Sequence, residues 1–177
     1  MAVCKVKDYT VGPNDTFFFD TCVWICIFAP IAGSKLFKQR AYSSLLADIR
    51  SRGAFIWINS QVVAEYVNAS LRIEFDQWKK RNSLFQADFK HDFRETEDYL
   101  SALQEIKNQM HDILRLTQRH PDDFHSMNVE KLIDDMGQTM DYGDVIMTSY
   151  CLKDHITLVT DDGDIVNSGL KINVITA

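Results

Sequence analysis

The chain has few cysteines and no closely spaced pair of them. Its four cysteines, Cys4, Cys22, Cys26 and Cys151, form no Cys-x-x-Cys motif, and the five histidines are scattered. Structural zinc sites are built from closely spaced cysteine and histidine ligands, so this spacing argues against a zinc site. Cysteines without a paired pattern are typical of a protein from a reducing compartment.

The chain also lacks the signatures of membrane insertion, of secretion and of two common enzyme classes. Its apolar stretch at 22–33 is shorter than the roughly 20 residues that a membrane-spanning helix needs. The N-terminus has no charged start followed by an apolar stretch, so no signal peptide is expected. A P-loop and a Gly-x-Ser-x-Gly motif are absent, which disfavours nucleotide-driven and serine chemistry. We therefore expect a cytoplasmic protein with no membrane partner.

Positive charge is in short supply as well. The 177 residues carry a formal net charge of -6, which argues against a generic basic nucleic-acid binder. A nuclease is not excluded, because its acidic centre contributes negative charge and its binding surface need only be locally basic. A composition 46% hydrophobic and 25% charged is ordinary for a soluble globular protein. The length suits a single domain spanning residues 1–177.

Short apolar runs alternate with helical segments along the chain. Residues 1–15 look polar and irregular, and residues 32–34 form a turn signal. The pattern predicts helices between the runs, among them one at about 35–51, and a largely parallel sheet in an α/β fold. The strands are expected at 16–20, 54–58, 156–159 and 170–175.

The composition changes between residues 71 and 139, where the chain is long, charged and rich in helix formers. We predict a helical insertion there, with one or two long helices at about 83–118 and a shorter one near 128–137. Its cations have two interpretations: a solvated helix face with ion pairs one turn apart, or a phosphate-contacting edge beside an acidic site. These cations are Arg72, Lys79, Lys80, Arg81, Lys90 and Arg94.

Acidic residues follow two of the predicted strands. Asp20 comes directly after the apolar run at 16–19, and Asp161, Asp162 and Asp164 come after the run at 156–159. In open α/β sheets, ligands bind at the carboxyl ends of the strands near the point where the strand order reverses. Two runs that each end in aspartate therefore predict one shared acidic site.

Two further acids lie on predicted helices that neighbour these strands. Asp144, with Asp141 before it, opens the helix that leads into the run at 156–159. Glu65 lies shortly after the strand at 54–58, so its carboxylate is within reach of the same site. Four carboxylates in a small volume cannot all ionise without compensation, and a hard divalent cation such as Mg2+ or Mn2+ supplies it. The predicted metal ligands and catalytic acids are Asp20, Glu65, Asp144 and Asp162.

One further acid and several polar residues complete the predicted site. Asp164 is also predicted to be catalytic, as a candidate to hold a second ion together with Asp162. Hydroxyl and amide side chains beside the acids are expected to position the carboxylates or to touch a scissile phosphate. The candidates for this substrate or supporting role are Thr21, Asn68, Asp141, Thr160 and Asp161.

Each acid also has a simpler interpretation. Asp20, Asp141 and Asp144 suit helix N-caps, and the run from Asp161 to Asp164 suits a polar turn. Glu65 alone is most often a solvated helix residue. These alternatives stay open at the level of sequence.

Taken together, four segments resemble the PIN-domain family of metal-dependent nucleases. They are FFFDTCVW, SQVVAEYVN, GDVIMTSYCLKDHITLVTDDGDI and GLKINVIT, and they cover about residues 15–70 and 140–177. The resemblance implies a Rossmann-like three-layer α/β/α sandwich, a Mg2+ or Mn2+ pocket and hydrolysis of RNA. Many small members are toxins of toxin–antitoxin pairs, so a protein antitoxin and a homodimer are implied as partners.

Two alternatives to a ribonuclease remain. The first is a catalytically inactive RNA-binding or assembly module on the same fold, since a fold does not determine a function. The second is a haloacid-dehalogenase-like phosphatase, which requires an Asp-x-Asp pair after the first strand. Here Thr21 and Cys22 follow Asp20, so this alternative is disfavoured.

Overall fold

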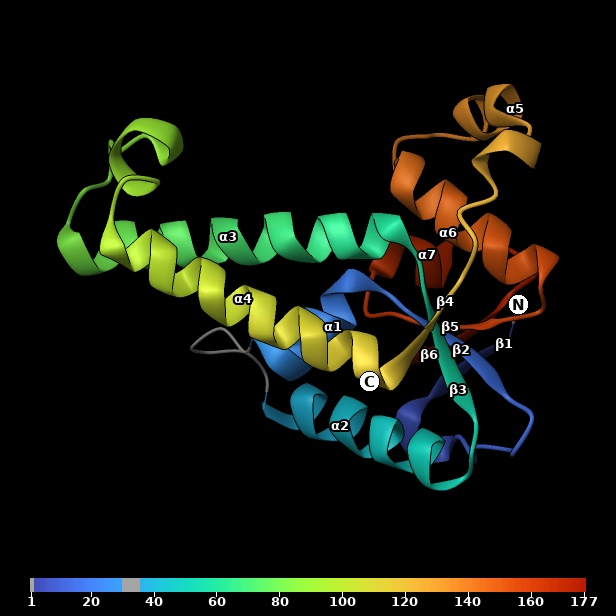
Figure 1. Cartoon of the computed structure of the whole chain (residues 1–177). Helices are drawn as coiled ribbons and strands as arrows, with labels where there is room; N and C mark the ends of the chain where they lie inside the picture. The colour runs from blue at the N-terminus through green and yellow to red at the C-terminus, as the bar shows by residue number, and fades with distance from the viewer. Residues whose placement is uncertain (1, 30–35) are drawn as a thin grey trace.

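The computed structural model describes residues 2–29 and 36–177, and its centre is a parallel β-sheet (Figure 1). The sheet order is β1-β6-β5-β2-β3-β4, and every described pairing between neighbours is parallel. The strands are β1 (Ala2–Lys5), β2 (Thr16–Phe19), β3 (Phe55–Ile58), β4 (Thr117–Arg119), β5 (Thr157–Val159) and β6 (Asn173–Thr176). The predicted α/β fold with a parallel sheet is confirmed.

Helices connect the strands and flank the sheet, which lies between α2 and α6 in Figure 1. This arrangement is a Rossmann-like three-layer sandwich. Within the described residues, no helix combines the length and the apolar character needed to cross a membrane. The helices are α1 (Thr21–Phe28), α2 (Leu36–Ser51), α3 (Ser60–Asn82), α4 (Glu97–Leu116), α5 (Val129–Asp134), α6 (Tyr142–Lys153) and α7 (Gly163–Asn167), with short turns η1 (Val6–Asp8), η2 (Phe89–Phe93) and η3 (Phe124–Ser126).

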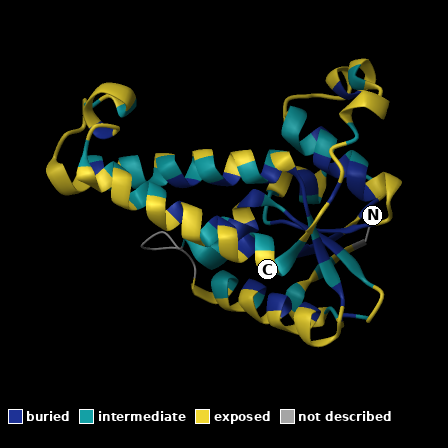
Figure 2. Ribbon diagram, viewed as in Figure 1, coloured by how far each residue is buried: buried dark blue, intermediate teal, exposed yellow. Residues whose placement is uncertain are grey.

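The central strands are buried on both faces. Phe17, Phe18 and Phe19 of β2 have no exposed surface, and all of β5 is buried. Figure 2 shows the strands mostly in the buried colour, with exposed residues on the outer faces of the helices. Continuous apolar runs are expected where helices cover both faces of a parallel sheet. This is why the runs at 16–19 and 156–159 were recognisable as strands.

The strand order reverses between β2 and β5. From β2 the chain adds β3 and then β4 on one side, whereas β5 and β6 lie on the other side. The two central strands are in register, with Phe18 opposite Leu158. In doubly wound sheets the crevice at such a reversal is where ligands bind. Asp20 and Thr160 are the first residues after these two strands.

Both edge strands differ from the prediction. Residues 1–15 were expected to be irregular, but β1 pairs with β6, with Cys4 opposite Ile175. The segment at 83–118 was expected to be helical, but α4 ends at Leu116 and β4 pairs with β3. Edge strands are short and partly solvated, so β1 and β4 carry no continuous apolar run. The turn signal at 32–34 and Lys35 lie outside the described residues.

The region at 71–139 contains the connection between β3 and β4. In Figure 1, α3 and α4 lie side by side as a long helical pair, and residues 83–96 form the far end of this pair. The chain then passes through β4 and η3 to α5, which is shorter than the helix predicted near 128–137. Part of the predicted insertion is therefore the long helical crossover that connects the parallel strands β3 and β4.

Candidate metal centre

Asp20 and Thr160 join the ends of the two central strands. Asp20 is the N-cap of α1, and its Oδ1 accepts a hydrogen bond from the backbone N–H of Cys22 (3.4 Å). The hydroxyl of Thr160, which is fully buried, donates to Oδ2 of Asp20 at 2.5 Å. The backbone N–H of Asp20 also donates to the carbonyl of Val159 (3.0 Å). The carboxylate of Asp20 is therefore fixed at the point where the strand order reverses.

The same threonine also orders Asp162. The oxygen of the Thr160 hydroxyl accepts from the backbone N–H of Asp162 at 3.0 Å. Asp162 in turn is the N-cap of α7, and its Oδ1 accepts from the backbone N–H of Asp164 (2.7 Å). A single buried hydroxyl thus links the segment of Asp162 to the carboxylate of Asp20.

Glu65 reaches the end of β2 from the second turn of α3. Its Oε2 accepts from the hydroxyl of Thr21 (2.9 Å), and its Oε1 accepts from the side-chain amide of Gln61 (2.9 Å). Because Thr21 follows Asp20 directly, this contact brings the Glu65 carboxylate beside the end of β2. Glu65 itself is exposed, so its remaining acceptor sites face solvent.

The start of α6 carries the remaining two acids. Asp141 and Asp144 form a capping box, in which each carboxylate accepts from the other's backbone N–H (3.1 and 3.2 Å). Gly143 between them lies against α3. A Cβ atom on this glycine would be 2.9 Å from Oε1 of Glu65, so no larger residue fits without a shift. The glycine therefore permits α6 to approach Glu65.

The electrostatics of Asp144 link the acids to one another. The pKa of this carboxyl is raised to about 6: burial is the largest cause, the charges of Asp141, Asp162 and Asp20 add to it, and a hydrogen bond from the Asp141 backbone acts in the opposite direction. Within residues 2–29 and 36–177, no lysine or arginine forms an ion pair with Asp20, Glu65, Asp144 or Asp162. The cluster is thus a concentration of negative charge that lacks a cationic partner in the described chain.

The carboxylates are gathered but not closed around a common point. Among the described residues, no three His, Cys, Asp or Glu side chains are arranged so that they could hold a metal ion. Each acid is instead held by protein donors: backbone N–H groups for Asp20, Asp144 and Asp162, the Thr160 hydroxyl for Asp20 as well, and a hydroxyl and a side-chain amide for Glu65. The donor set, all carboxylate oxygens, fits a hard divalent cation once the side chains turn toward one another.

Asp161 faces away from this cluster. Its carboxylate forms an ion pair with Lys38 of α2 and accepts from the hydroxyl of Thr176 (3.2 Å). Burial acts to raise the pKa of Asp161, but the hydrogen bond and charge of Lys38 outweigh it and the pKa lies below its ordinary value. Asp161 is therefore already compensated, unlike its neighbour Asp162.

Two other predicted residues lie at the margin. Asp164 is exposed on the first turn of α7, and its carboxylate accepts no hydrogen bond from the described residues. Asn68 is exposed on α3 one turn beyond Glu65, and in the described part of the chain it makes no hydrogen bond to an acid of the cluster. Neither side chain is held in the cluster in this structure.

The helix-cap interpretation is correct for Asp20 and Asp141 but wrong for Asp144, which is the capping-box partner of Asp141. Asp162, interpreted as part of a polar turn, is the N-cap of α7. Capping does not use up a carboxylate, which has about four acceptor positions on its two oxygens. Caps at three neighbouring helix starts also place the positive ends of those helices at one location. The capping role and a metal-binding role are therefore compatible.

Sequence reasoning missed some contacts of the site. Gln61 lies one helical turn before Glu65, and this spacing of four residues is a signal that could have identified it. The close approach at Gly143 also has a signal, because glycine is an unfavourable residue within a helix and its presence there indicates a close neighbour. The pairing of Lys38 with Asp161 joins residues 123 apart and has no local signal.

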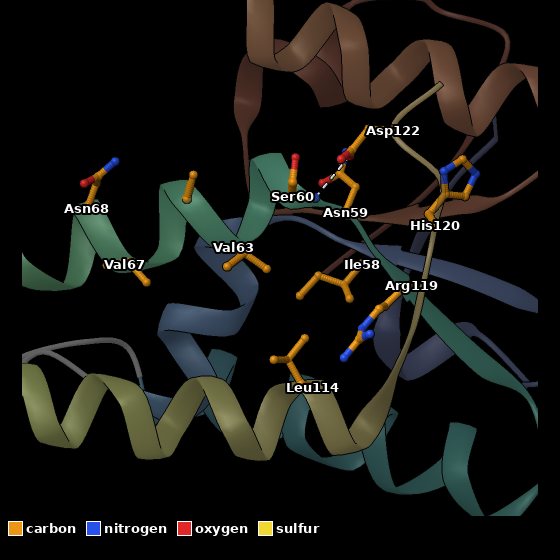
Figure 3. Close-up of a pocket in the computed structure, with 11 residues that line it drawn as sticks. Ile58, Asn59, Ser60, Val63, Val67, Asn68, Leu114, Arg119, His120 and Asp122 are labelled. Atoms are coloured by element: carbon orange, nitrogen blue, oxygen red, sulfur yellow. Dashed lines mark hydrogen bonds between the residues drawn. The ribbon is translucent and has the colours of Figure 1, made fainter. Parts of the chain in front are cut away.

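A cavity of about 600 Å³ lies between α3, α4 and β4 (Figure 3). Val63 and Val67 point into this cavity, and Asn68 is also among the residues that line it. Leu114 and Arg119 close the opposite side. None of the four predicted metal ligands lines it, whereas the predicted substrate residue Asn68 does.

Comparison with known proteins adds no family assignment. No model of a known protein family matches the chain, and no curated protein matches it. An α/β fold by itself hosts many unrelated functions. The interpretation of the acidic cluster therefore rests on its position in the sheet, its contacts and its charge.

Proposed function

We propose that the chain is a Mg2+- or Mn2+-dependent ribonuclease that hydrolyses phosphodiester bonds of RNA, with its ion held by Asp20, Glu65, Asp144 and Asp162. One observation carries the proposal: acids from four separate elements gather where the strand order reverses, and the described chain offers them no cationic partner. The resemblance of the surrounding segments to PIN-domain nucleases supports the choice of RNA.

A divalent ion bound there would neutralise the carboxylates, activate a water molecule and stabilise the charge that develops on the phosphate. The protein's own part is to hold the ligands. Thr160 fixes Asp20 and orders the segment of Asp162, and Thr21 fixes Glu65. Glu65 is exposed, so besides binding the ion its carboxylate can orient an incoming water or accept its proton.

The test is cleavage of structured RNA by the full chain with Mn2+. EDTA and Asp20→Asn are expected to reduce the rate by on the order of 100-fold or more, because each removes charge stabilisation of the transition state. Asp161→Asn is the matched control: it is the same substitution near the same strand ends, but in an acid that Lys38 already compensates. Cleavage that persists in EDTA or in Asp20→Asn contradicts the mechanism, and an equal loss in Asp161→Asn contradicts the assignment of ligands.

A second function has an observation in its favour. The carboxylates do not close around one point in the described structure, which suits a catalytically inactive RNA-binding or assembly module. Such a module binds RNA equally well with and without Mn2+ and cleaves none. Measuring RNA binding and cleavage in the same titration separates the two functions.

The family resemblance also supports a role as a cytoplasmic toxin that a protein antitoxin blocks. Expression of an active toxin arrests growth, and Asp20→Asn is expected to relieve the arrest. Co-expression of a small DNA-binding protein encoded beside this chain is expected to restore growth and to form a stable complex. Normal growth on expression of the wild-type chain contradicts this role without affecting the proposed chemistry.

A further inference from the structure

A polar stripe runs along α3 from the acidic cluster. Glu65, Asn68 and Arg72 are three and four residues apart, which places them on one face of the helix, and all three are exposed. At a rise of about 1.5 Å per residue, Arg72 lies roughly 10 Å farther along the helix than Glu65. Asn68 lines both the cavity between α3 and α4 (Figure 3) and a second cavity farther along α3.

The stripe leads into a second cavity, of about 620 Å³, between α3 and the segment at 88–94. Figure 1 shows this segment at the end of the α3–α4 pair that lies away from the sheet. Three cations line the cavity together with two aromatic rings. The cations are Arg72, Lys90 and Arg94, and the rings are those of Phe75 and Phe89.

The cations of the region fall into two groups. Lys79 pairs with Asp76 at 2.9 Å, and Arg81 lies 3.8 Å from Asp98, so these two belong to a solvated face with ion pairs. Arg72, Lys90 and Arg94 are exposed and form no ion pair within the part of the chain that the structure describes. Lys80, Lys107 and Arg119 are also exposed and outside these ion pairs, but they do not line the cavity. The cavity therefore gathers three unpaired cations in one place.

The one acid in this cavity is already engaged. The carboxylate of Asp88 caps the segment and accepts from the backbone N–H groups of Lys90 and His91, both at 2.8 Å. These hydrogen bonds hold the pKa of Asp88 below its ordinary value, so it stays ionised. Three cations against one acid leave a cavity with a net positive charge, in a chain whose formal net charge is -6.

The segment that carries two of these cations is packed onto α3. Phe75 of α3 contacts Phe89 and Phe93, with ring centroids 5.3 and 5.4 Å apart. Phe93 is almost fully buried, whereas Phe75 and Phe89 stay partly exposed at the cavity. Lys90 and Arg94 are therefore presented by an anchored element, beside accessible aromatic surface.

We propose that this cavity binds phosphate groups of a single-stranded RNA segment, so that the strand follows the stripe on α3 to the acidic cluster. Unpaired cations next to partly exposed aromatic rings are the combination by which proteins hold single strands, through phosphate contacts and base stacking. The choice of RNA rests on the proposed ribonuclease function, whereas the site itself rests on the cavity and its charges.

The test measures binding of a single-stranded RNA oligonucleotide to the full chain carrying Asp20→Asn, in EDTA, so that no cleavage occurs. The test variant combines Arg72→Gln, Lys90→Gln and Arg94→Gln. The control combines Arg115→Gln, Lys131→Gln and Lys153→Gln, which changes the net charge equally but removes exposed cations that are already ion-paired. Circular dichroism establishes that both variants are folded.

The test variant is expected to lose on the order of 100-fold in affinity at moderate salt, and the control roughly threefold or less. For the test variant, the slope of the logarithm of the RNA-binding constant against the logarithm of the salt concentration should be smaller in magnitude by about 2, since each of the three lost phosphate contacts contributes about 0.7 on a single strand. An equal loss in both variants overturns the proposal, because net charge alone would then explain binding. Displacement of the RNA by polyglutamate at equal charge concentration also overturns it, in favour of an acidic protein partner.

Cleavage assays separate this inference from the proposed function. With Mn2+ and an otherwise wild-type centre, the test variant should lose kcat/KM on a long RNA but not on a dinucleotide, which cannot reach the cavity. Cleavage of long RNA at the wild-type rate overturns the inference and leaves the ribonuclease intact. Absence of any cleavage by the wild-type chain, with the difference in RNA binding preserved, overturns the ribonuclease and leaves the binding site intact.

Discussion

The raised pKa of Asp144 predicts that the acidic cluster costs the metal-free protein stability. The pKa of this carboxyl is about 6 in the folded chain, against a model-compound value of 3.8. A raised folded pKa means that its contribution to stability is fully present below the unfolded pKa and is lost as pH rises through about 6. The shift of about 2 units corresponds to about 3 kcal/mol at most, and solvent screening of this half-buried group reduces it to about 1–2 kcal/mol.

The perturbation that tests this is Asp144→Asn. Asparagine is neutral and nearly isosteric, and its side-chain oxygen can still accept from the backbone N–H of Asp141. In EDTA at about pH 8, the variant should be more stable than the wild type by about 1–2 kcal/mol, and at about pH 4 the difference should vanish. Urea unfolding at the two pH values measures both differences. Asp134→Asn, an exposed aspartate at the end of α5, is the control and should show no such dependence.

Divalent ions should reverse the order of stability of the wild type and Asp144→Asn. Mg2+ should raise the stability of the wild type at about pH 8, because binding to the folded state alone stabilises it, and should do little for Asp144→Asn. The stability difference between Asp144→Asn and the wild type should be larger at high pH than at low pH. An equal difference at both pH values would refute the argument that burial and neighbouring carboxylates destabilise the ionised form of Asp144.

Three further predictions follow from the contacts of the site. Gly143→Ala should change the free energy of unfolding by no more than about 1 kcal/mol, since alanine favours a helix. It should nevertheless weaken Mn2+ binding at least threefold, as measured by calorimetric titration, because the added methyl group displaces the Glu65 carboxylate. Thr160→Val should lower the free energy of unfolding by about 1–3 kcal/mol and abolish cleavage, whereas Thr160→Ser should retain most of both; equal losses would contradict the role of the hydroxyl. Lys38→Gln should lower the free energy of unfolding by up to about 1 kcal/mol, because Lys38 lowers the pKa of Asp161 in the folded chain. This loss of stability should be present above the unfolded pKa of Asp161 and should shrink as the pH falls through its folded pKa. The rate of RNA cleavage should not change.

The central strands could be predicted from the sequence because their burial leaves a clear pattern. The runs that became β2, β3 and β5 are apolar and bounded by polar residues, and the first of them is completely buried at Phe17, Phe18 and Phe19. The edge strands carry no such pattern. β4 has the sequence Thr-Gln-Arg and is recognisable only once it pairs with β3, a long-range event that local composition does not encode.

The location of the acidic cluster was predictable, but the orientation of its members was not. The rule that ligands bind at strand ends identifies Asp20 and the acids after β5 as neighbours. It does not say that Asp161 turns to Lys38 while Asp162, one residue later, stays with Thr160. That choice depends on the distant helix α2. The same holds for the cations at 71–139, whose two interpretations are separated only by knowing which carboxylates are near.

The most direct test of the central claim is to measure the binding of Mn2+ to the full chain by isothermal titration calorimetry at about pH 8, which is above the raised pKa of Asp144. We expect at least one site in the wild type, its loss in Asp20→Asn and in Asp144→Asn, and its retention in Asp161→Asn. A wild-type chain that binds no Mn2+, or an Asp20→Asn chain that binds it as well as the wild type, would contradict the account.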